Sequence, residues 1–185
     1  MTKRPLMKKM LVGLGVCFFL LIAGSYVVVN GISFKVAGYR SFNKRLDDAH
    51  LREMEGRFDY AYDTNEGQLR QFALRNTAFE LDFDMHTNAL QNPNAILDRK
   101  SGHCKMYSYV VAATYNQMAK RKNIKGSCRV AYGYVYLYGV NLHQFFKSSF
   151  FRNHDFCVIT DRNGVRAADA ILFDYALIDQ IRLRK

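Results

Sequence analysis

The spacing of apolar residues in the middle of the chain predicts an amphipathic helix over residues 66–83. Arg70 and Arg75 fall between the apolar positions and are expected to face water. The apolar stripe consists of Leu69, Phe72, Ala73, Ala78, Phe79 and Leu81. A loop rich in turn formers follows this helix.

A second helix is predicted from Cys104 to about Arg121, because apolar residues again recur three and four positions apart. Ser101 is expected to cap its start, and Asn123 can end it. Cys104 would then lie in the first turn of the helix. A third helix is possible over residues 46–54.

The pattern changes to a period of two in the last third of the chain. Residues 128–138 are rich in Val and Tyr and predict a strand, and an irregular aromatic segment follows over 139–153. Two further strands, 156–160 and 165–170, are separated by the turn-forming residues 161–164. Helices followed by strands predict an α+β domain with an antiparallel sheet.

An uncharged apolar run near the start of the chain, residues 10–29, is long enough to cross a bilayer of about 30 Å. A cleaved signal peptide is the alternative, but the run continues through Val29 and favours an uncleaved transmembrane anchor over residues 10–30. Residues 1–9 would form a basic cytoplasmic tail. The anchor would tie the protein to a membrane through this segment.

The rest of the chain divides into a linker and packing region, 31–64, and one folded domain, 65–185. Lys8 and Lys9 abut the apolar run, and keeping the short tail inside avoids moving its charges across the membrane. The domain is therefore expected outside the cytoplasm.

The chain carries a formal net charge of +11, of which four positive charges precede the apolar run. A surplus of this kind favours acidic partners without identifying one. The densest basic run surrounds Arg121, where cations stabilise the C-terminus of the predicted helix. No nucleic-acid-binding motif accompanies it, so no nucleic-acid partner is expected.

Three cysteines lie outside the apolar run, and they are not equivalent. Cys128 and Cys157 fall within predicted strands, where they would be buried structural residues or a disulfide pair. Cys104 follows Gly102 at a predicted helix N-terminus, where backbone N–H groups and the helix dipole lower a thiol pKa. Cys104 is therefore the candidate nucleophile.

A nucleophilic cysteine needs a base and a group that orients the base. Pairing Thr160 with Val165 across the predicted hairpin would place His154 opposite Ile171 and make His154 and Asp169 diagonal neighbours on one face. His103 adjoins the cysteine but is expected to point away around the helix. His143 as the base and Asp174 as the acid are the competing choices.

These residues occur in an ordered pattern that resembles the transglutaminase-like superfamily. Gly102, Cys104 and Tyr107 match its G-x-C-x-x-Y element at the start of a helix, and NHDFCVITDRNGVRAADA matches its later histidine and aspartate strands. The resemblance implies a papain/transglutaminase-like core, with Cys104, His154 and Asp169 as the catalytic triad. The size and membrane-proximal position are similar to bacterial transglutaminase-like cysteine proteinases that act outside the cytoplasm, which implies a bacterial inner-membrane location.

The sequence therefore predicts a membrane-anchored cysteine peptidase or amidase that acts on a protein or peptide substrate through a thioacyl intermediate. Resolution of this intermediate by an amine would instead make the protein a crosslinking acyltransferase. A non-catalytic binding or scaffold protein with the same fold is the third alternative. No cofactor is expected, and the spacings of zinc sites such as Cys-x-x-Cys are absent from the sequence, so no metal is expected either.

Overall fold

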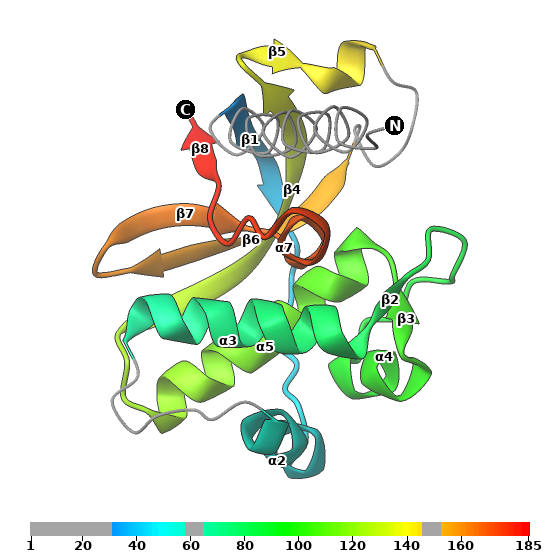
Figure 1. Ribbon diagram of the computed structural model, residues 1–185, viewed down its shortest axis with the longest axis vertical. Helices are drawn as coiled ribbons and strands as arrows, with labels where there is room; N and C mark the ends of the chain where they lie inside the picture. The colour runs from blue at the N-terminus through cyan, green and yellow to red at the C-terminus, as the bar shows by residue number, and fades with distance from the viewer. Residues whose placement is uncertain (1–30, 58–64, 146–152) are drawn as a thin grey trace, which may run out of the picture.

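The computed structural model describes residues 31–57, 65–145 and 153–185. It is an α+β structure in which a twisted six-stranded sheet carries most of its helices on one side (Figure 1). The strands of this sheet are β1 (Ile32–Tyr39), β4 (Gly126–Leu137), β5 (Val140–Asn141), β6 (His154–Asp161), β7 (Gly164–Ala168) and β8 (Arg182–Arg184). The helices are α2 (Asp48–Arg57), α3 (Glu66–Glu80), α4 (Pro93–Arg99), α5 (Cys104–Arg121) and α7 (Ala170–Ala176), with a 3-10 turn η1 (Leu142–Gln144). A separate two-stranded sheet joins β2 (Asp82–Phe83) to β3 (Ser101–Gly102).

The strand order in the main sheet is β7-β6-β4-β1-β8, with β5 pairing to β4. Neighbouring strands are antiparallel except β1 and β8, which are parallel. The prediction of an antiparallel sheet is therefore wrong, because β8 adds a parallel strand at one edge. This strand has only three residues, which is too few to show a pattern in the sequence. Strand β1 lies between β4 and β8, so part of the region predicted as linker is an inner strand of the sheet.

The prediction of a transmembrane helix falls on residues that the structure does not describe. None of the helices formed by the described residues is long and apolar enough to cross a membrane. The predicted anchor, residues 10–30, lies outside the described residues. For the described residues, the predicted fold is therefore corrected to an α+β structure with a mixed sheet and without a membrane-spanning helix.

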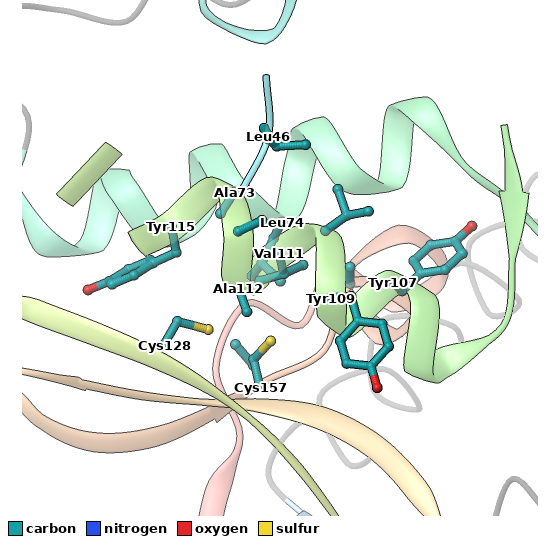
Figure 2. Packing of buried hydrophobic residues seen from close by; sticks show 14 of the residues in the cluster. Leu46, Ala73, Leu74, Tyr107, Tyr109, Val111, Ala112, Tyr115, Cys128 and Cys157 are labelled. Atoms are coloured by element: carbon teal, nitrogen blue, oxygen red, sulfur yellow. The ribbon is translucent and has the colours of Figure 1, made fainter. Parts of the chain in front are cut away.

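Helix α5 is the centre of the larger hydrophobic core. It lies between α3 and the sheet, and Figure 2 shows Val111 and Tyr115 of this helix among the buried side chains, with Cys128 and Cys157 on the sheet below. Most of the helix is buried, because it is covered on one side by α3 and on the other by β4 and β6. A smaller core on the other part of the sheet includes Phe34 and Phe156.

Helix α3 begins, as predicted, at Glu66, where Asn65 and Gln68 form a capping box. The prediction that Arg70 faces water is wrong: its side chain is buried and pairs with Asp179 at 3.2 Å. Phe79, predicted in the apolar stripe, is 67% exposed. Both errors arise because α3 packs against α5 and α7, so its buried face is wider and differently centred than a one-sided stripe.

Helix α5 spans Cys104 to Arg121 as predicted, but Ser101 does not cap it. Ser101 pairs with Asp82 in the small parallel sheet, and the N-cap position is His103. The hydroxyl of Tyr107 donates a hydrogen bond to the carbonyl of Leu81, which ties the first turn of α5 to the end of α3. The start of the helix is thus held from two directions.

The backbones of the paired strands β1 and β4 approach each other closely at Gly133, opposite the bulge in β1. A Cβ atom on Gly133 would lie 1.9 Å from the carbonyl oxygen of Lys35. Gly133→Ala should therefore destabilise the protein by about 3 kcal/mol or more, since backbone must move. Gly56→Ala is the matched control, because nothing lies within 4 Å of the added carbon in helix α2. Thermal unfolding should show a large loss for the first variant only, and equal midpoints would contradict the close approach.

Candidate active site

Cys104 is the first residue of α5 and is partly buried. The preceding residue, His103, has an extended backbone with φ −103° and ψ 180°, which ends the β3 segment and starts the helix. The N–H groups of the first helical turn have no acceptor within the helix, and the dipole makes this end positive. The thiol therefore lies where a negative charge is stabilised.

His154 is the first residue of β6, and its imidazole is completely buried. The Nε2 atom hydrogen-bonds to Oδ2 of Asp169. The ring of Phe34 meets the imidazole edge-on, with 5.4 Å between the ring centres. The ring of Phe156 is nearly parallel to the imidazole, with 6.3 Å between the ring centres. The aromatic rings hold the imidazole in one plane, with Nε2 on the aspartate and Nδ1 as the nitrogen left for the thiol.

Asp169 is held by the helix that follows it. Its Oδ1 atom accepts hydrogen bonds from the backbone N–H groups of Ile171 at 2.9 Å and Leu172 at 3.3 Å, so it is the N-cap of α7. Its Oδ2 atom is left for His154. A carboxylate that caps a helix is fixed in position and favoured in its charged form.

The hairpin register that predicted this contact is confirmed in part. Thr160 pairs with Val165, and the pairing continues to Cys157 with Ala168. Beyond this point β7 ends and the chain enters α7, so the predicted pairing of His154 with Ile171 is wrong. The helix turns Asp169 toward His154 instead of leaving it in a strand.

Three groups lie close enough to the Cys104 thiol to lower its pKa: the side chains of His103 and His154, and the backbone N–H of Asp155. The outer edge of β6 is open at Asp155 because β7 pairs only from Cys157 onward, which leaves this N–H available. The prediction that His103 points away is wrong. As the N-cap residue it stands outside the helix, so its side chain does not follow the helical spacing.

These neighbours shift both ionisable groups toward an ion pair. Burial raises the pKa of Cys104, but hydrogen bonds from His103 and His154, the charge on His154 and the Asp155 N–H outweigh burial and lower it to about 7. Burial lowers the pKa of His154, but the charge and hydrogen bond of Asp169, with a further contribution from Cys104, raise it to about 10. A thiolate beside an imidazolium is therefore favoured above neutral pH.

A pocket of about 240 Å³ opens at the thiol. It is lined by Arg40, Phe83, Met85, His103, Cys104, Asn153 and Asp155. Arg40 pairs with Asp155 at 2.7 Å and 3.2 Å, and its guanidinium lies 4.4 Å from the centre of the Tyr132 ring. This ion pair forms one wall of the pocket and holds the strand segment that carries the histidine.

Arg40 and Asp155 are the site residues that the sequence did not suggest. Arg40 lies in the region predicted as linker, and only the pairing of β1 with β4 brings it to the pocket. Asp155 is adjacent to His154 in the sequence, but its role is carried by its backbone N–H and its ion pair, which no motif reveals.

The competing candidates lie elsewhere. His143 is in η1, and its Nε2 atom accepts a hydrogen bond from the backbone N–H of Val135. Asp174 is in α7, where burial and Asp82 raise its pKa. Cys128 and Cys157 are buried in the sheet with free thiols, as structural residues rather than a disulfide pair. Among the residues that the structure describes, no three His, Cys, Asp or Glu side chains converge as metal ligands would.

Comparison of the chain with protein-family models, with curated proteins and with solved structures found no significant match.

The three thiols outside the apolar run of residues 10–29 should react with iodoacetamide at different rates in the folded protein. Cys104 should react first, because its pKa is low and it is partly exposed. Cys157 should lag, since burial and the neighbouring Cys128 raise its pKa well above the usual range. Mass spectrometry of a time course measures the order, and similar rates at all three cysteines would contradict an activated Cys104.

The reactivity of Cys104 should also depend on pH in a defined direction. A lowered thiol pKa means that thiolate is lost as the pH falls below about 7. Alkylation should therefore rise with an apparent pKa near 7 and then level off, whereas an ordinary thiol would rise near pH 8.5. A profile with its midpoint above pH 8 would contradict the ion pair.

Proposed function

We propose that the protein is a cysteine hydrolase that cleaves a peptide or amide bond in a protein substrate through Cys104, His154 and Asp169. The observation that carries this proposal is the partly exposed thiol at the N-terminus of α5, beside a buried imidazole that is hydrogen-bonded to a buried carboxylate. The resemblance of these segments to the transglutaminase-like superfamily is a second support.

The first step is attack of the Cys104 thiolate on the substrate carbonyl carbon. The C–S bond forms, the carbonyl π electrons move to oxygen, and collapse of this intermediate expels the amine. The His154 imidazolium gives the amine its proton. Asp169 keeps the imidazole oriented and its charge balanced, and the product of this half-reaction is a thioacyl-enzyme.

The second step is attack on the thioacyl carbon by water, with His154 as the base that takes its proton. The C–S bond then breaks and the thiolate is restored. An amine in place of water would give a crosslinked product by the same steps, so product analysis with and without an added amine distinguishes a hydrolase from an acyltransferase.

Substrate access is supported by the pocket at the thiol. Phe83 and Met85 give it an apolar side, and the Arg40–Asp155 pair gives it a polar side. Its volume of about 240 Å³ is enough for one side chain rather than a folded partner. A protein substrate would therefore present an extended segment or loop at this surface.

Turnover should respond to the triad residues in a graded way when full-length variants are assayed on a casein or peptide library. Cys104→Ala should abolish cleavage while leaving the unfolding temperature nearly unchanged, because a small, partly exposed side chain is removed. His154→Ala should lower kcat on the order of 10⁶-fold, since it removes the group that exchanges the proton with the leaving amine and the attacking water. His143→Ala is the matched control and should keep wild-type activity.

Asp169 needs a separate design because it also caps α7. Asp169→Asn keeps an oxygen for the helix N–H groups and removes the charge, so kcat should fall on the order of 10⁴-fold with a small stability change. Asp169→Ala should add a loss of about 1 kcal/mol of stability through the missing cap. An active His154→Ala enzyme beside an inactive His143→Ala enzyme would overturn the assignment.

A further inference from the structure

His103 and His154 have different surroundings: His103 lines the pocket with Cys104, whereas His154 is fully buried and is not among the residues that line it. The side chain of His103 is close enough to the thiol to help lower its pKa, and His154 does the same from the start of β6. The side chain of His103 makes no capping hydrogen bond to α5, although it occupies the N-cap position. Its contact with the sulfur therefore does not arise from a structural role at the helix start.

Attack of the thiolate moves negative charge from sulfur to the former carbonyl oxygen, two bonds away. A hydrolase of this kind needs hydrogen-bond donors aimed at that oxygen, and His154 cannot serve because its proton goes to the leaving amine. The backbone N–H of Cys104 is one available donor, since the hydrogen bonds of α5 begin with Met106 and Tyr107, which donate to the carbonyl of His103.

The second donor must come from the pocket wall. The guanidinium of Arg40 is committed to Asp155 through two hydrogen bonds, and the Asp155 N–H is directed at the sulfur. His103 adjoins Cys104, is partly exposed, lines the pocket and favours negative charge on the sulfur. During attack the negative charge moves to the oxygen on the carbon that is bonded to sulfur. An N–H of His103 beside the sulfur can hydrogen-bond that oxygen.

We infer that His103 is a catalytic residue that, together with the backbone N–H of Cys104, hydrogen-bonds the oxyanion of the tetrahedral intermediate. This inference rests on the proposed function. It adds a second histidine to the site, one that stabilises charge on the substrate and leaves the proton transfer to His154. His103 therefore accelerates attack of the thiolate on a carbonyl carbon, but not attack on a saturated carbon.

Two reagents separate this role from simple activation of the thiol. Iodoacetamide alkylates the thiolate at a saturated carbon and forms no oxyanion, whereas a p-nitrophenyl ester acylates it through a tetrahedral oxyanion. His103→Ala in the full chain should lower acylation by the ester on the order of 100-fold, the usual effect of losing one oxyanion donor. Alkylation, compared above the apparent thiol pKa, should change by only a few-fold.

His103→Gln is the rescue variant, because its side-chain amide keeps an N–H donor, and it should recover a large part of the acylation rate. His50→Ala is the control histidine: it lies on α2, where it contacts Asp47 and Asp98, and should change neither rate. Unfolding temperatures of all variants should stay close to that of the wild type, since His103 makes no capping bond.

Equal losses of acylation and alkylation in His103→Ala would overturn the inference, because His103 would then act on the thiolate alone. No loss of acylation, or no recovery in His103→Gln, would overturn it as well. These outcomes leave the proposed function standing as long as acylation depends on Cys104. Acylation that survives in Cys104→Ala would instead overturn the proposed function itself.

Discussion

The candidate site depends on the hydrogen bond between His154 and Asp169, which is fully buried. A buried imidazole without a charged partner would lose its proton, because burial lowers its pKa. Asp169 reverses this, and it can do so because the two N–H groups at the start of α7 fix its other oxygen. The charge on the histidine in turn lowers the pKa of Cys104.

The rest of the fold positions the thiol against this pair. Tyr107 ties the first turn of α5 to the end of α3, and the small β2–β3 sheet holds the chain just before it. On the sheet, Arg40 binds Asp155 and ties the segment that follows β1 to the start of β6. These three attachments bring together segments that are distant in the sequence, so the site forms only when helices and sheet are assembled.

Several features could be predicted because they depend on short-range rules. The α5 helix, the β6–β7 hairpin register and the burial of Cys128 and Cys157 follow from residue spacing and turn chemistry, and the structure agrees with them. The errors at Arg70 and Phe79 have the opposite cause. Which face of α3 is buried depends on two neighbouring helices, and a single segment carries no record of where they pack.

The sequence by itself determined which residues are candidates for the chemistry: a cysteine at a helix start, and a histidine and an aspartate near the two ends of one hairpin. These follow from local geometry, since spacing along a helix or strand sets direction. Only the tertiary structure decided that β8 joins the sheet in parallel, that Asp169 caps a helix, and that His103 and Arg40 reach the pocket. Such contacts join segments far apart in the chain, and their free energy depends on the whole packed arrangement rather than on any one segment.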